Sequence, residues 1–360
     1  MTIDLNTLLK AMIDQGASDL HLTVNAPPVL RINGQLVRTK SESLRSDDTQ
    51  RICYSILTEE QKRKFEEHKE LDFAFGVKNL ARIRANLFVQ RGAVAAVFRR
   101  IPSEVPGLNT LGLPPAVQNL TDKPNGLILI TGATGSGKST TLAAMLDRIN
   151  QTKRYHIITI EDPIEYTHKH KMCLVNQREI GTDCESFSRA LRQVLREDPD
   201  VIMVGEMRDA ETAEAALKAA ETGHLVFSTL HTNGAIQCIN RLVKMFPADQ
   251  QDYIRNLLSF TIEGIVSQAL CERQDRKGRI MVYEFLALTP AIRNLIRENK
   301  LHQVYSQMQI GQDIHGMVTM NQNLYFQAQQ NVISHQEALA HSPDPEELQR
   351  LFDRGGRRSA

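Results

Sequence analysis

The chain has 360 residues, with 43 Lys or Arg, 42 Asp or Glu and a formal net charge of +1. This length allows two or three domains, and the balanced charge gives no general attraction to nucleic acid or anionic lipid. Its apolar runs are far shorter than the roughly 18–20 residues needed to span a bilayer. We therefore expect no membrane span and no nucleic-acid partner.

The amino-terminal residues and the cysteines indicate a cytoplasmic protein. Residues 1–16 are acidic and amphipathic, without the basic start and apolar stretch of a signal peptide. The cysteine number is odd, no C-x-x-C pair occurs and zinc-ligand spacing is absent. We expect buried, reduced thiols at Cys53, Cys173, Cys184, Cys238 and Cys271.

Residues 1–100 mix helical and strand patterns, which predicts a small α+β module. Residues 4–15 carry a helical apolar stripe, and residues 19–24 alternate as a strand. The remaining expected elements are a hairpin over 29–37, helices over 49–57 and 59–68, and strands over 72–75, 82–89 and 93–100. Pro and Gly then cluster within 102–115, so we expect a linker over 101–115.

From residue 116 onward we expect an α/β domain that extends to residue 360. Short apolar runs alternate with helical segments, which predicts a mostly parallel sheet with helices on both faces. The expected strands are 127–131, 157–160, 201–204 and 225–229, and the expected helices between them are 139–150, 185–197 and 210–222. The part from about 248 to 353 is predicted to be a string of helices.

A complete G-x-x-x-x-G-K-[ST] motif lies between an expected strand and an expected helix, which predicts a P-loop that binds ATP. Its glycines allow backbone N–H groups to turn towards the phosphates, beside a helix N-terminus. We expect Lys138 to reach the β and γ phosphates and Ser139 to ligate Mg²⁺. The binding segment is Gly132, Ala133, Thr134, Gly135, Ser136, Gly137, Lys138, Ser139 and Thr140.

Acidic residues follow two other expected strands. Glu206 comes after the strand 201–204, where a carboxylate can hold Mg²⁺ directly or through water. Glu161, Asp162 and Glu165 follow the strand 157–160 and can position an attacking water. We favour Glu165 as the base, with Glu161 next.

Basic residues can complete such a site. His231 follows the strand 225–229, where it could sense the γ-phosphate, although a histidine hydrogen-bonded to backbone is the alternative. Phosphoryl transfer usually needs arginines to neutralise charge in the transition state. Arg208 is one candidate in the core, and Arg82 and Arg84 lie on one face of an expected strand because side chains two apart point the same way.

Together these motifs resemble the secretion ATPases that power type IV pili and type II secretion. The resemblance runs from residue 16 to about 300. Ile160–Glu165 resembles the Asp box of that family, Gly205–Asp209 its atypical Walker B motif, and Thr222–His224 with Leu230–Thr232 its His box. The resemblance implies a homohexameric ring with a PAS-like N-terminal domain and a RecA-like ATPase domain. It also implies that Arg84 and Arg99 act on the neighbouring subunit.

Within that family, Ala291–Glu298 matches a signature of the retraction ATPases of type IV pili. This resemblance implies pilus disassembly and twitching motility, at the cytoplasmic side of the inner membrane. The implied partners are an integral platform protein and a second retraction ATPase. By pattern alone, the segment is an ordinary packed helix. The segment Ser342–Leu348 resembles the accessory retraction ATPases. The alternative that this chain is a paralogue of the main motor therefore stays open.

Three alternatives stand beside this interpretation. A pilus extension or type II secretion ATPase usually carries a longer N-terminal region and a four-cysteine zinc module, and we expect neither here. A nucleic-acid-translocating motor shares the RecA-like core but needs a basic channel. A regulator that binds nucleotide without turnover would not need the retained Glu165 and Glu206.

Overall fold

The computed structural model describes residues 4–32, 34–77, 80–102 and 104–356. The chain divides into two compact units. The first comprises Met1–Glu104 with the short segment Pro163–Thr167, and the second comprises Val105–Asp162 with His168–Ala360. The division falls inside the segment predicted as a linker. However, Leu108 and Leu113 are buried in the core of the second unit, so this end of the segment is packed structure.

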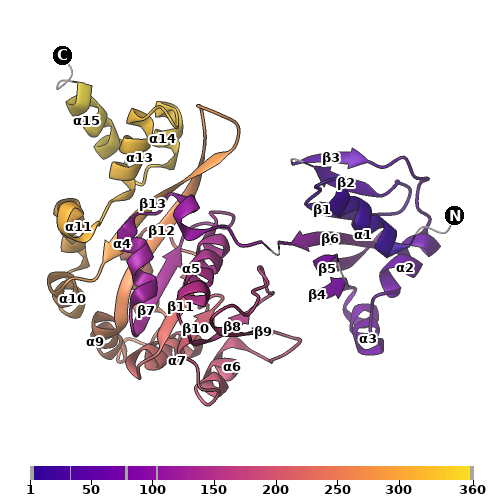
Figure 1. Cartoon of the computed structure of the whole chain (residues 1–360), viewed down its shortest axis with the longest axis horizontal. Helices are drawn as coiled ribbons and strands as arrows, with labels where there is room; N and C mark the ends of the chain where they lie inside the picture. The colour runs from indigo at the N-terminus through magenta and orange to yellow at the C-terminus, as the bar shows by residue number, and fades with distance from the viewer. Residues whose placement is uncertain (1–3, 33, 78–79, 103, 357–360) are drawn as a thin grey trace. The chain divides into compact units, whose positions relative to one another are not determined.

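The first unit is a six-stranded antiparallel sheet covered by helices (Figure 1). The strand order is β3-β2-β1-β6-β5-β4. The strands are β1 (Asp19–Leu22), β2 (Val29–Ile32), β3 (Gln35–Arg38), β4 (Glu70–Val77), β5 (Ala81–Gln90) and β6 (Ala93–Ile101). The helices are α1 (Leu5–Asp14), α2 (Ser46–Tyr54) and α3 (Glu59–His68). The expected α+β character of this region is therefore observed.

The core of the first unit follows from the sequence periodicity. In α1, Leu5, Leu8, Leu9 and Met12 recur at helical spacing and are all buried. They pack with buried strand residues such as Phe98. Since this core uses only residues of the first unit, the unit has the apolar interior that an independently folding domain requires.

The second unit is built on a seven-stranded, mainly parallel sheet in the order β13-β12-β7-β11-β10-β8-β9. Each neighbouring pair is parallel except β12 and β13. The strands are β7 (Gly126–Thr131), β8 (His156–Glu161), β9 (Leu174–Glu179), β10 (Val201–Val204), β11 (Leu225–Leu230), β12 (Ile262–Glu272) and β13 (Arg279–Ala287). Every position of β7 is buried, which explains why residues 127–130 form a continuous apolar run rather than an alternating pattern.

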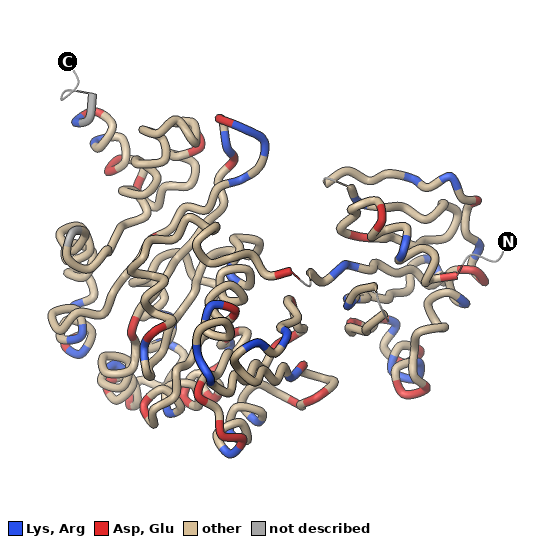
Figure 2. The backbone as a smooth tube through the Cα atoms, in the orientation of Figure 1, with Lys and Arg blue, Asp and Glu red and all other residues tan. Residues whose placement is uncertain are grey.

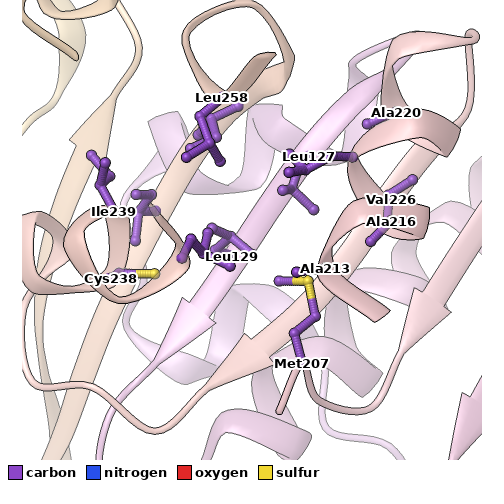
Figure 3. Packing of buried hydrophobic residues seen from close by; sticks show 14 of the residues in the cluster. Leu127, Leu129, Met207, Ala213, Ala216, Ala220, Val226, Cys238, Ile239 and Leu258 are labelled. Atoms are coloured by element: carbon purple, nitrogen blue, oxygen red, sulfur yellow. The ribbon is translucent and has the colours of Figure 1, made fainter. Parts of the chain in front are cut away.

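Helices cover both faces of this sheet. They include α4 (Pro115–Gln118), α5 (Lys138–Thr152), α6 (Phe187–Val194), α7 (Ala210–Glu221), α8 (Ala235–Lys244) and α9 (Gln251–Thr261). One apolar cluster packs α5 against the sheet, and another packs α6 to α9 against it. Figure 3 shows the latter, in which the small Ala213 and Ala216 of α7 share one interior with Leu129 of β7.

The prediction that residues 248–353 are all helical is wrong. Two long strands, β12 and β13, lie in this range, and residues 264–272 of β12 pair with the whole of β13. Most of β12 is buried, including Ile265 and Val266, so it shows no alternation that separates a strand from a buried helix. The helices that follow are α10 (Pro290–Arg297), α11 (Val304–Ile310), α12 (Gln312–His315), α13 (Met320–Gln329), α14 (His335–His341) and α15 (Pro345–Gly356).

The last helices pack on the β12–β13 hairpin. Cys271 and Val282 of the two strands form an apolar cluster with Leu324 of α13 and Leu348 of α15. Within each unit, acidic and basic residues are interspersed, and the tip of the hairpin carries mainly basic ones (Figure 2). Among the described helices, none is both long and apolar enough to cross a membrane.

Candidate active site

The P-loop lies where the sequence predicts it, between β7 and α5. Gly135 and Gly137 have φ of +80° and +91°, a conformation that L side chains rarely adopt. Gly132 is required for a further reason. A Cβ there would lie 2.2 Å from the carbonyl oxygen of Gln268 and 2.7 Å from Ser136 Oγ. The glycines of the motif therefore permit both the turn and its close packing against β12.

Two polar side chains of the loop are buried. The Lys138 ammonium donates to the carbonyl oxygens of Gly132 at 3.0 Å and of Ala133 at 2.9 Å, so it lies within the turn. The hydroxyl of Ser136 is also buried, and no described residue is its hydrogen-bond partner. A buried hydroxyl normally has a partner. The Lys138 cation, the Ser136 hydroxyl and the N-terminus of α5 together fit a phosphate group.

The acidic residue predicted after β10 lies between two basic groups. Glu206 is only 13% exposed and pairs with Arg208. Its other carboxylate oxygen lies 3.3 Å from Nε2 of His231. The hydrogen bond and the charge of Glu206 raise the pKa of Arg208. The structure therefore brings together three of the residues singled out in the sequence, from the ends of β10 and β11.

Backbone and threonine contacts hold this carboxylate in place. Met207, next to Glu206, is buried in the apolar cluster beside Ala213 (Figure 3). Its N–H donates to the carbonyl oxygen of Thr229 at 3.2 Å, and the Thr229 hydroxyl donates to the Gly205 carbonyl at 2.6 Å. The turn after β10 is thus fixed against the end of β11, which fixes the position of the Glu206 side chain.

Glu161 ends β8, next to this turn. The N–H of Gly205 donates to the carbonyl oxygen of Ile160 at 2.8 Å. The Glu161 carboxylate accepts hydrogen bonds from the Thr159 hydroxyl at 2.6 Å and from the Gln177 side chain at 3.0 Å. Its side chain is buried and oriented by neutral donors, so it is a fixed acceptor at the strand ends.

Several other predicted residues belong to the first unit. Glu165 is exposed, in the segment Pro163–Thr167 that belongs to the first unit. Arg84 and Arg99 also belong to that unit, where they are direct cross-strand partners on β5 and β6. His224, quoted for its resemblance to the His box, precedes β11 at the amino end of the strand. Its Nδ1 lies 3.0 Å from the carbonyl oxygen of Ala219, so it is not part of the site at the carboxyl ends.

Carboxylates hold the two paired arginines. Nε and Nη2 of Arg84 donate to Asp72 at 3.2 and 2.6 Å, a bidentate arrangement. Arg99 Nε donates to Asp19 at 2.8 Å, while the Arg99 side chain stays 64% exposed. Burial by itself raises the pKa of Asp19, but hydrogen bonds from Arg99 and Ser18 bring it below its ordinary value. The face of β5 and β6 thus presents two oriented guanidinium groups.

A protein-family comparison is consistent with this arrangement. The model of the type II/IV secretion system protein family matches residues 1–338. The chain belongs to this family. It is an ATPase, in agreement with the complete P-loop, and the resemblance predicted from the motifs is confirmed.

Several members of the family match this chain over nearly its whole length. The type IV pilus retraction ATPase PilT of Pseudomonas aeruginosa is 47% identical, over 96% of this chain and 99% of the relative. The type IV pilus ATPase PilU of the same organism is 39% identical, over 99% and 94%. A crystal structure of the pilus retraction motor PilT with bound ADP has a TM-score of 0.91 and 53% identity, over 97% and 99%.

A less similar ATPase shares the fold. The ATPase DotB of Legionella pneumophila has a TM-score of 0.77 and 28% identity, over 93% of this chain and 94% of its own. The α/β architecture of this chain is therefore shared with both PilT and DotB, and the sequence identity is higher to PilT.

One residue of the site was missed in the sequence. The Gln268 side chain donates to the carbonyl oxygen of Ser136 at 2.9 Å and accepts from the Thr141 hydroxyl at 3.0 Å, bridging the P-loop and α5. It lies on β12, in the region that was predicted to be helical. A glutamine within a buried apolar run was the available signal, since a buried amide needs partners.

Proposed function

We propose that this chain is the ATP-hydrolysing motor of type IV pilus retraction, the activity that disassembles the pilus during twitching motility. The observation that carries the proposal is the complete P-loop, with Glu206 at the same edge of the sheet, in a chain that aligns with PilT over 96% of its length. The proposed location is the cytoplasmic side of the inner membrane, on an integral platform protein.

In the proposed site, the P-loop and Lys138 bind the ATP phosphates. Ser139 and Glu206 would hold Mg²⁺, Glu206 directly or through water, since hydroxyl and carboxylate oxygens are the ligands that this ion prefers. The bound ion would neutralise charge on the phosphates. Ser136, with its buried hydroxyl, would donate to a phosphate oxygen.

Glu165 is the proposed base that activates the attacking water, with Glu161 as the alternative. Glu165 is exposed, whereas Glu161 is buried and already accepts two neutral hydrogen bonds. Its burial suits Glu161 to a structural role, and we assign the proton-accepting role to the exposed Glu165, which water can reach. His231, 3.3 Å from Glu206, would sense the γ-phosphate by exchanging this contact during the cycle.

The active assembly in this proposal is a homohexameric ring. Each subunit would use a PAS-like first unit and a RecA-like second unit, with ATP held by the second unit of one subunit and the first unit of the next. Arg84 and Arg99 then complete the neighbouring site. Their cross-strand pairing and their aspartate partners support this role, because two oriented guanidinium groups match the charge of a transferring phosphoryl group.

Deletion of the gene tests the direction of pilus movement. The expected mutant carries many surface pili and does not twitch, because extension continues without retraction. A mutant without pili would instead identify an extension ATPase. If the protein is a paralogue that assists a main retraction motor, the mutant should still retract some pili. Stimulation of ATP hydrolysis by DNA in the purified protein would favour a nucleic-acid motor.

Phosphate release by the purified protein tests the base. Glu165→Gln keeps the shape of the side chain and removes the proton acceptor, so we expect a loss of roughly 10²–10⁴-fold in kcat. Glu161→Gln is the matched comparison. Full hydrolysis by Glu165→Gln together with loss in Glu161→Gln would transfer the role to Glu161.

A further inference from the structure

A thiol, a carboxylate and an imidazole lie together outside the active site, where the C-terminal helices pack on the sheet. Cys271 is on β12, and Glu337 and His341 are four residues apart on α14. One ligand atom of each lies within 4.8 Å of the other two. Since residues four apart share one face of a helix, the side chains of Glu337 and His341 both point from α14 towards the strand.

We propose that Cys271, Glu337 and His341 bind one zinc ion, which fastens α14 to β12. Thiolate, imidazole and carboxylate are the three side-chain ligands that zinc uses in proteins. Magnesium and calcium prefer sites made only of oxygen ligands, and a cysteine disfavours both. The spacing in the chain gives no sign of this site, because its ligands come from a strand and a helix 66 residues apart.

The distances suit a tetrahedral ion after a small adjustment. Glu337 Oε1 and His341 Nε2 are 3.2 Å apart, close to the roughly 3.3 Å expected between two ligands that are each about 2.0 Å from zinc. The sulfur must come within about 3.6 Å of the other two ligand atoms. The side chains of Glu337 and His341 are 24% and 33% exposed and can therefore rotate towards Cys271.

The surroundings provide further features of a metal site. The backbone N–H of Glu272 donates to Glu337 Oε1 at 2.7 Å and orients the carboxylate beside the thiol. Such outer contacts commonly fix metal ligands. His341 also lines a cavity of about 540 Å³, from which water can supply a fourth ligand. Binding converts the Cys271 thiol into a zinc-bound thiolate and releases its proton to solvent.

The site lies on a strand that also reaches the P-loop. Gln268, three residues before Cys271 on β12, donates to the carbonyl oxygen of Ser136. The cavity lined by His341 likewise extends to Ala133–Ser136 of the P-loop. An ion at Cys271 would therefore fix the C-terminal helices to the strand that supports the nucleotide site, without taking part in hydrolysis.

Cobalt binding to the full-length protein tests the site. After chelation and removal of the chelator, Co²⁺ should bind at one ion per chain and give a thiolate-to-cobalt charge-transfer band that Zn²⁺ abolishes. Cys271→Ser should lose the band. His341→Gln should weaken Co²⁺ binding by at least the roughly 10–100-fold expected for the loss of an outer-shell partner. Zn²⁺ should raise the thermal midpoint of the wild type more than that of either variant.

Cys184→Ser is the control, because Cys184 is less buried than Cys271 and lies far from α14 in the chain. It should keep the full band. Absence of the band in the wild type, its persistence in Cys271→Ser, or its loss in Cys184→Ser would overturn the proposal. If Cys271→Ser does not fold, His341→Gln tests the proposed metal site instead. Unchanged cobalt binding in His341→Gln would also overturn the proposal.

Discussion

Glu206 is held by two basic side chains, and these contacts fix the position of its carboxylate. Arg208 and His231 both contact it, and the buried Met207 anchors the turn on which it lies. A carboxylate held this way needs little reorganisation when charge develops nearby. Glu206 lies at the edge of the sheet where β7 leads into the P-loop. This position suits its carboxylate to organise a metal ion or its water ligands rather than to accept a proton.

Glu206→Gln should therefore impair hydrolysis much more than nucleotide binding. The substitution keeps the size of the side chain and removes its charge, so we expect kcat to fall by about 10²–10³-fold with nearly unchanged affinity for ADP. Phosphate release and a fluorescent-ADP titration measure the two quantities. Equal losses in both would mean that Glu206 mainly supports the fold of the site.

The Asp19–Arg99 pair should make the first unit sensitive to acid. Because the folded pKa of Asp19 is lowered, its stabilising contribution is complete well above the ordinary value of 3.8 and is lost as the pH falls through the folded pKa. Asp19→Asn should cost roughly 1–3 kcal/mol at pH 7. The difference in urea midpoint from the wild type should shrink as the pH falls below about 4. A pH-independent difference would show that packing, not charge, is involved.

At the scale of elements, α10 combines a packed face with an exposed one. Ile292 and Ile296 are fully buried, and Leu295 packs on the same cluster but is partly exposed. Arg293 fastens the helix by donating to the carbonyl oxygens of Ser259 and Phe260 and to the Glu263 carboxylate. The residue pattern predicted the packed face correctly, whereas a role in retraction rests on the resemblance.

Substitutions on the two faces of α10 should separate stability from retraction. Ile296→Ala leaves a cavity and should cost about 2–5 kcal/mol, so its effects would not be specific. Leu295→Ala should cost only about 1 kcal/mol and should reduce twitching while ATP hydrolysis stays near the wild-type rate. Twitching zones, phosphate release and thermal midpoints should be compared for both variants. Parallel losses of hydrolysis and twitching in Leu295→Ala would support a packing role alone.

The elements also show where prediction from the sequence succeeds and fails. The P-loop was placed correctly because its glycines and lysine follow a buried strand in one local motif. The pairing of Arg84 with Arg99 depends on strand register, and the role of Gln268 depends on β12 lying parallel to β7. Such long-range contacts leave no local pattern. A fully buried strand such as β12 also lacks the alternation that would have identified it.

At the scale of the whole molecule, the proposed ring makes each site depend on two chains. Lys138 would belong to the subunit that binds ATP, and Arg84 and Arg99 to its neighbour. In a ring of one variant only, loss of either set disables every site. A mixed ring is different, because some sites then combine an intact P-loop with intact arginines.

Mixing two inactive variants should therefore restore hydrolysis. Lys138→Ala should abolish ATP binding, and the double variant Arg84→Ala, Arg99→Ala should lose on the order of 10³-fold in kcat. After the two are co-assembled, sites formed by the P-loop of the arginine variant and the arginines of the Lys138 variant are complete. Phosphate release by equal mixtures should then reach a substantial fraction of the wild-type rate.

Arg100→Ala is the matched control for this experiment. Arg100 is adjacent to Arg99 on β6, but successive strand residues point to opposite faces, so it should not reach the same site. This variant should hydrolyse ATP normally by itself. If mixtures of the two inactive variants stay inactive although they form mixed rings, the arginines act within their own chain, and the dependence of one site on two chains is excluded.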